Sequence, residues 1–188
     1  KEFEYRFANK MNRKFAVSVT NGTAAIELVI SRLNLKPGDE VIIPSFTIIS
    51  CITQIIRCGA KPVLVDCDLK TWNTSIERIE EKINNNTRAI LVVHIYGLPV
   101  DIDPIIEICE EKSIILIEDA SEMHGQFYKD RPCGSFGLAS TFSFYPNKHI
   151  TTGEGGMILT DDQDFYNSLC HYKNLCFGKT FRYEHDDL

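Results

Sequence analysis

The feature that most constrains the fold is a series of short apolar runs separated by segments with helical periodicity. The runs AILVVH (89–94) and SIILIE (113–118) lack an alternation of polar and apolar residues, as expected for parallel strands that helices cover on both faces. Alternation of such strands with helices predicts an α/β fold with a mostly parallel, doubly wound sheet. The predicted strands are Phe15–Val19, Val41–Ile43, Pro62–Val65, Ala89–His94, Ile114–Glu118, Thr141–Phe144 and Met157–Thr160. The predicted helices are Lys1–Asn12, Thr23–Leu33, Ile48–Arg57, Ser75–Asn84, Asp103–Lys112 and Asp162–Cys176.

Composition excludes several classes of function. The 188 residues include 20 Lys and Arg against 26 Asp and Glu, for a net charge of −6. That balance argues against a nucleic-acid partner, because neutralising phosphates needs clustered basic residues. The longest uncharged stretch, Val41 to Ile56, contains Pro44 and is shorter than a membrane-spanning helix. We therefore expect neither nucleic acid nor membrane as a partner.

The seven cysteines follow no metal-binding or disulfide pattern. Their number is odd, their spacing is irregular and no C-x-x-C pair occurs, so neither a disulfide framework nor a zinc site is expected. Most of them lie in apolar runs, where a free cysteine behaves as a small buried hydrophobe. This usage predicts a reducing, cytoplasmic compartment.

Polar residues cluster where the predicted strands end, which is where open α/β sheets bind ligands. The first cluster is TNGT (20–23), between a strand and a helix. Gly22 allows close backbone approach, Thr23 offers a hydroxyl, and the helix N-terminus favours an anion such as phosphate. An ordinary helix-capping turn is the alternative, and the turn has neither Walker nor G-x-G-x-x-G spacing.

A second cluster, Glu118, Asp119, Glu122 and His124, ends a buried strand. A carboxylate that emerges from an apolar strand needs a cationic or proton-bearing partner, because an unpaired buried charge is costly. The protonated ring nitrogen of a cofactor would serve. A divalent metal and a solvated acidic loop are the two alternatives, and the metal is disfavoured because no second His/Asp cluster accompanies this one.

The third cluster surrounds Lys148, directly after an aromatic strand and before Gly153, Gly155 and Gly156. A lysine between apolar walls can act as an amine nucleophile that forms a Schiff base, although most lysines are surface residues. The order of the three clusters, with Ser143 five residues before the lysine, meets the needs of pyridoxal phosphate: an anion site, a carboxylate for the ring nitrogen and an amine for the aldehyde. We therefore predict this cofactor and no metal.

The chain as a whole resembles the DegT-type nucleotide-sugar aminotransferases, which are pyridoxal-phosphate enzymes of the aspartate-aminotransferase fold. The resemblance rests on a series of blocks in the family's order: NGTAAIELVI, KPGDEVIIPSFT, GAKPVLVDCD, VHIYGLPVD, IEDASEMHG, GSFG, FSFYPNK and ITTGEGGMILTDD. The segments HIYGLPVDIDPI and FSFYPNKHITTGEGGM are similar to those of the branch that aminates carbon 4 of GDP-4-keto-6-deoxymannose with glutamate as donor.

The resemblance assigns catalysis to Lys148, as the lysine that forms the Schiff base and then moves protons during the reaction. It assigns Asp119 to the ring nitrogen and Glu122 to the ring's phenolic oxygen, where many relatives have Gln. The lysine also favours transamination over dehydration, because a related dehydratase branch has His in its place.

The remaining cofactor contacts that the resemblance implies lie on the phosphate side. Gly22 and Thr23 match the phosphate-binding turn and Ser143 matches a second phosphate contact. His124 is expected to support the site without touching the reacting atoms. Ile48 stands where relatives often stack an aromatic ring on the cofactor, so aliphatic packing is expected there.

The family also implies what lies around this chain. Residues 1–188 would be the cofactor-binding large domain of a subunit about twice as long, without its N-terminal segment and C-terminal small domain. The subunit would act in polysaccharide biosynthesis as a homodimer with shared active sites, on a nucleotide sugar and glutamate. Two alternatives remain open: an aminotransferase acting at carbon 3 or on a UDP or dTDP sugar, and an inert chain that only binds a ligand or partner.

Overall fold

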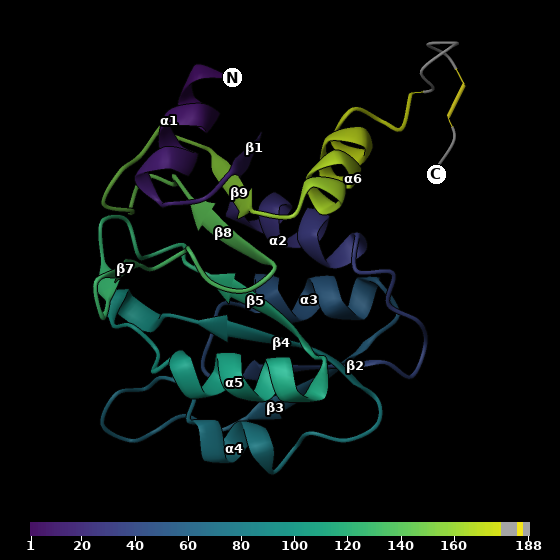
Figure 1. Ribbon diagram of the computed structural model, residues 1–188, viewed down its shortest axis with the longest axis vertical. Coiled ribbons are helices and arrows are strands. Elements are labelled where there is room, and N and C mark those ends of the chain that lie inside the picture. The colour runs from purple at the N-terminus through teal and green to yellow at the C-terminus, as the bar shows by residue number, and fades with distance from the viewer. Residues whose placement is uncertain (178–183, 186–188) are drawn as a thin grey trace.

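The computed structural model describes residues 1–177 and 184–185 (Figure 1). Its centre is a seven-stranded sheet in the order β1-β9-β8-β5-β4-β2-β3. The strands of this sheet are β1 (Phe15–Val19), β2 (Glu40–Pro44), β3 (Lys61–Val65), β4 (Thr87–Val93), β5 (Ile115–Asp119), β8 (Ala139–Ser143) and β9 (Gly156–Thr160). The helices are α1 (Glu2–Lys10), α2 (Gly22–Ser31), α3 (Ile49–Arg57), α4 (Ile76–Glu80), α5 (Asp103–Lys112) and α6 (Gln163–Lys173), with a short 3-10 helix η1 (Ile95–Gly97).

The sheet confirms the prediction of a mostly parallel arrangement. Strands β3, β2, β4, β5 and β8 pair in parallel, and β9 pairs antiparallel with both β8 and β1. In this register Val93 lies beside Asp119, and Asp119 lies beside Thr141. The carboxyl ends of three neighbouring strands therefore meet at one edge, which positions the polar loops that follow them.

Helices cover both faces of the sheet (Figure 1). Helices α2, α3 and α6 pack on one face, while α4 and α5 pack on the other and α1 covers that same face beside β8 and β9. Successive residues of β4 alternate between these layers: Leu91 belongs to the α2 and α3 core, and Ile90 and Val92 to the α4 and α5 core. This burial on both faces explains why the central strands are continuously apolar.

Side-chain caps set the limits of several helices. Asn21 caps α2 by accepting a hydrogen bond from the Ala24 N–H at 2.8 Å, and Asp162 caps α6 through the Phe165 N–H at 2.7 Å. The helix predicted over Ser75–Asn84 is shorter than expected and ends at Glu80. Downstream, the Asn84 amide donates to Glu40 at 2.7 Å, which ties this segment to β2 instead.

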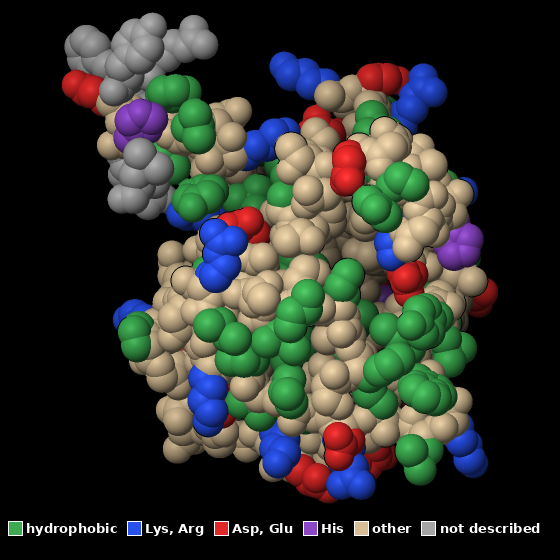
Figure 2. Space-filling model, turned by 180° about the vertical axis from the view of Figure 1, so that it is seen from behind, with side chains coloured by type: hydrophobic (Ala, Val, Ile, Leu, Met, Phe, Trp, Pro, Cys, Tyr) green, Lys and Arg blue, Asp and Glu red, His purple; other side chains and the backbone are tan. Residues whose placement is uncertain are grey.

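Two features of the fold were not predicted: a small hairpin, and exposed hydrophobic side chains on helix α3. A small hairpin joins β6 (Phe127–Tyr128) to β7 (Arg131–Pro132) through two residues with positive φ, Lys129 and Asp130. Figure 2 looks onto the face that carries α2 and α3, where hydrophobic side chains are exposed, including Ile49 and Ile56 of α3. Among the described residues, no helix is long and apolar enough to cross a membrane.

Candidate active site

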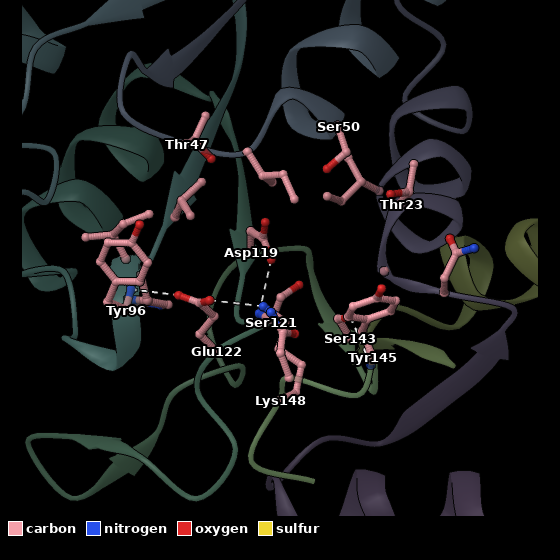
Figure 3. Close-up of a pocket in the computed structure, with 18 of the residues that line it drawn as sticks. Thr23, Thr47, Ser50, Tyr96, Asp119, Ser121, Glu122, Ser143, Tyr145 and Lys148 are labelled. Atoms are coloured by element: carbon pink, nitrogen blue, oxygen red, sulfur yellow. Dashed lines mark hydrogen bonds and ion pairs between the residues drawn. The ribbon is translucent and has the colours of Figure 1, made fainter. Parts of the chain in front are cut away.

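A cavity of about 600 Å³ opens at the carboxyl edge of the sheet (Figure 3). Its walls come from the loops after β1, β2, β4, β5 and β8. The structure brings all six predicted site residues to this one cavity: Gly22, Thr23, Asp119, Glu122, Ser143 and Lys148.

Gly22 and Ser143 form one end of the cavity. A Cβ on Gly22 would lie 2.8 Å from the Ser143 Cβ, so only glycine allows the turn and the end of β8 to approach this closely. Gly22 also begins helix α2, and the first N–H groups of a helix have no carbonyl partner within it. With the exposed Thr23 beside them, these groups make a site suited to a phosphate-sized anion.

Asp119 lies at the end of β5 with a side chain that is almost fully buried. Its Oδ1 accepts a hydrogen bond from the Ser121 N–H at 3.1 Å and faces the Thr141 hydroxyl at 3.5 Å. Its Oδ2 lies 3.3 Å from the Cys51 Sγ. Because the cavity side of the carboxylate is open, a cationic N–H group of a ligand has a negative acceptor there.

Glu118, the neighbour of Asp119, faces the opposite side of the strand and pairs with His94. The His94 Nδ1 accepts from the Val100 N–H at 2.9 Å, so the ring proton sits on Nε2, which donates to the Glu118 Oε1 at 2.7 Å. The carboxylate also accepts from the N–H groups of Gly134 and Phe136. The hydrogen bond to Glu118 therefore fixes the ring of His94, which also lines the cavity.

Lys148 reaches into the cavity from the turn after β8 (Figure 3). Its side chain is only 15% exposed, and its Nζ forms an ion pair with the Glu122 Oε1 at 3.0 Å. The other Glu122 oxygen accepts from the Tyr96 N–H at 2.7 Å. Tyr96 has a φ of +49°, a backbone conformation that is costly for a residue with a side chain.

Several residues of the cavity wall were not among the predicted site residues. Phe46 and Thr47 follow β2, and Tyr96 and Asn147 flank the Glu122–Lys148 pair. Phe46 and Thr47 come shortly after a predicted strand. That position could have pointed to them, because open α/β sheets bind ligands where strands end. Nothing local in the sequence marks Cys51, which approaches Asp119 only through the packing of α3 on the sheet.

Ile48 and His124 are two further residues for which the sequence led to an expectation. Ile48 lines the cavity and is 61% exposed, so its aliphatic side chain faces the space where a ligand would lie. Neither ring nitrogen of His124 has a hydrogen-bond partner among the described residues. Burial, with smaller effects from His149 and Lys148, lowers the pKa of His124 to about 4.

A metal-binding arrangement is not found in the described part of the chain. Within it, no three His, Cys, Asp or Glu side chains are grouped so that they could hold a metal ion. What the cavity offers is an anion site at Gly22, a buried carboxylate at Asp119 and a primary amine at Lys148. This set matches a flat, phosphate-bearing ligand with a protonated ring nitrogen and a carbonyl group.

The fold and this set of side chains define a domain of the aminotransferase type. The chain belongs to the DegT/DnrJ/EryC1/StrS aminotransferase family, whose model matches residues 1–188. Both the predicted family and the predicted fold are confirmed.

The chain is also similar, over nearly its whole length, to individual proteins. The chain is 43% identical to a GDP-perosamine synthase of Escherichia coli O157:H7 over 98% of its own length and 51% of that protein. It is 40% identical to a dTDP-3-amino-3,6-dideoxy-alpha-D-galactopyranose transaminase of Aneurinibacillus thermoaerophilus, covering 97% of this chain and 50% of the relative. The structure of E. coli GDP-4-keto-6-deoxy-D-mannose-3-dehydratase with bound hydrated PLP matches with a TM-score of 0.90 and 34% identity, over 95% of this chain and 48% of that one. The chain thus spans about half the length of these relatives.

Proposed function

We propose that this chain binds pyridoxal phosphate and belongs to a transaminase that moves an amino group from glutamate to a 4-keto-6-deoxy nucleotide sugar. GDP-4-keto-6-deoxymannose is the proposed acceptor and GDP-perosamine the product. The likeness to GDP-perosamine synthase supports this choice of sugar and nucleotide.

The observation that carries the proposal is the position of Lys148. Its amine lies in a cavity with a buried carboxylate on one side and a helix N-terminus on another, and it is held by Glu122 at 3.0 Å. A surface lysine would have none of these neighbours. Bound pyridoxal phosphate would supply an electron sink for the carbon from which the proton is removed.

The residues present fit this cofactor. Gly22 and Thr23, with Ser143 opposite, would hold the phosphate, since a Cβ on Gly22 would close that end of the cavity. Asp119 would accept a hydrogen bond from the protonated ring nitrogen. Glu122 would lie on the phenolic side, and Ile48 would pack against a ring face.

The ion pair also suggests how Lys148 becomes a nucleophile. An ammonium must lose a proton before it can attack a carbonyl, and the Glu122 carboxylate is the acceptor within hydrogen-bond distance. The Tyr96 N–H fixes the second oxygen of Glu122 and keeps the first aimed at Lys148. The unprotonated Lys148 amine can also take up a proton from the substrate carbon and return it.

The wider setting is also proposed. We infer that residues 1–188 form the cofactor-binding domain of a longer subunit, which relatives about twice as long support. Exposed apolar side chains on α3, at Ile49 and Ile56, are compatible with a homodimer that completes the site. A cytoplasmic location suits the seven cysteines, which follow no disulfide pattern, and a nucleotide-sugar substrate.

The first test is attachment of the cofactor. The protein mixed with pyridoxal phosphate should develop visible absorption that borohydride bleaches, and peptide mapping should then find the label on Lys148. Lys148→Ala should remove the label and reduce transamination by at least about a thousand-fold, because a covalent step is lost. As a matched control, Lys112→Ala replaces a surface lysine of α5 that pairs with Glu111. A Lys148→Ala protein that keeps full turnover would contradict the proposal.

A second test separates the alternatives. A panel of GDP, UDP and dTDP keto sugars, offered with glutamate, should give an amine at carbon 4 of the GDP sugar. Faster turnover of a dTDP sugar at carbon 3 would favour the other function, which the dTDP-sugar relative supports. A chain that never attaches the cofactor would favour a binding function without chemistry.

A further inference from the structure

A buried thiol lies directly behind the Asp119 carboxylate. Cys51 sits on helix α3 with no exposed surface, and its Sγ is 3.3 Å from the Asp119 Oδ2. The Thr47 hydroxyl approaches the same sulfur at 3.6 Å. These three side chains come from the loop after β2, from α3 and from the end of β5, so only the folded chain brings them together.

The direction of the hydrogen bonds follows from the chemistry of the groups. A carboxylate only accepts, so the thiol must donate to Asp119, and the Thr47 hydroxyl donates to the sulfur. Burial and the charge of Asp119 raise the pKa of the Cys51 thiol, which keeps its proton in place. Cys51 is therefore a hydrogen-bond donor and no nucleophile.

The two oxygens of Asp119 are held unequally. The Ser121 N–H fixes Oδ1 at 3.1 Å, with the Thr141 hydroxyl beyond it. The thiol is the protein donor that the structure gives to Oδ2. Because a thiol is a weak donor, it can orient this oxygen while leaving most of its negative charge for another partner.

We propose that Cys51 is a positioning residue, which holds the Asp119 carboxylate at the angle needed to accept a hydrogen bond from the ring nitrogen of the cofactor. The inference rests on the proposed function. Cys51 acts only through Asp119, since the thiol does not line the cavity. Removal of the thiol leaves Oδ2 without its protein donor, so the carboxylate loses its fixed orientation.

The experiment compares cofactor affinity in Cys51→Ala and Cys51→Ser with that of the unchanged protein. Alanine removes the donor and serine keeps one, so we expect about five-fold weaker binding of pyridoxal phosphate for alanine and recovery to within two-fold for serine. The matched control is Cys109→Ala, which removes a buried thiol from the α5 side of the sheet. Cys109→Ala should bind pyridoxal phosphate as the unchanged protein does.

A second probe isolates the contact to the ring nitrogen. In 1-deazapyridoxal phosphate a carbon replaces that nitrogen, so the Asp119 hydrogen bond cannot form. We expect Cys51→Ala to lose affinity for pyridoxal phosphate but to bind the deaza analogue as the unchanged protein does. A simple packing defect beside α3 would weaken the binding of both probes equally.

The outcomes separate this inference from the proposed function. Equal losses for both probes, failure of serine to restore affinity, or tighter binding by Cys51→Ala would overturn the role of Cys51 while leaving the function intact. An unchanged protein that does not bind pyridoxal phosphate at all would overturn the proposed function, and this inference with it.

Discussion

His124 should make the stability of this protein depend on pH in a way that one substitution removes. Its ring packs against Phe7, Phe142 and Phe144, with centroids 6.5, 5.5 and 5.3 Å away. Burial, together with the nearby His149 and Lys148, lowers the pKa of His124 from 6.5 to about 4. The folded chain therefore keeps this imidazole neutral at pH values where the unfolded chain protonates it.

The sign and size follow from linkage. Between pH 6.5 and pH 4 the unfolded state binds a proton that the folded state does not, so stability is present above pH 6.5 and is lost as the pH falls toward 4. The full loss is about 3 kcal/mol, of which about 2 kcal/mol has already occurred at pH 5. Exposed carboxylates with a lowered pKa, such as Asp68, contribute little down to pH 5, because their ordinary pKa of 3.8 lies below that pH.

The perturbation is His124→Phe, which fills the same space and removes two buried nitrogens that have no hydrogen-bond partner among the described residues. Urea titrations of the cofactor-free protein, followed by far-UV circular dichroism at pH 7.5 and 5.0, give the free energy of unfolding at each pH. The unchanged protein should lose about 2 kcal/mol more than His124→Phe between the two values. His149→Gln, an exposed site, should keep most of the dependence. Parallel losses in His124→Phe and the unchanged protein would refute the reasoning.

Two further substitutions test the phosphate end of the cavity and the buried carboxylate that faces away from it. Gly22→Ala places a Cβ 2.8 Å from the Ser143 Cβ. It should weaken the binding of pyridoxal phosphate at least about ten-fold and change the affinity for pyridoxal, which has no phosphate, by less than two-fold. Equal losses of affinity for the two ligands in equilibrium titrations would argue against a phosphate site. Glu118→Gln removes the charge that three N–H donors, including His94, surround, so urea titration should show a loss of about 2–4 kcal/mol. Glu77→Gln, on the short helix α4, is the matched control and should stay within about 0.5 kcal/mol of the unchanged protein.

The sequence predicted the sheet well because its physical signals are local. Apolar runs and caps such as Asn21 mark where strands and helices begin, and the predicted limits agree with the structure to within two residues, except at helix ends such as Glu80. Family blocks named six of the residues that line the cavity, although their roles stay predictions. The contact of Cys51 with Asp119 could not be predicted, because it depends on how α3 packs across the sheet and has no counterpart in residue spacing.

The adjacent carboxylates Glu118 and Asp119 show why the cluster at the end of β5 is not one site. Successive residues of a strand face opposite sides of a sheet, so Glu118 points toward His94 while Asp119 faces the cavity. Glu118 accepts three hydrogen bonds from the protein and is fully buried, so a ligand in the cavity does not reach it. Asp119 lines the cavity, and among the described residues a weak thiol is the donor to its Oδ2, so of the two carboxylates it alone can receive a cationic group. The alternation of side chains along β5 therefore determines that Glu118 supports the fold and that Asp119 faces the ligand.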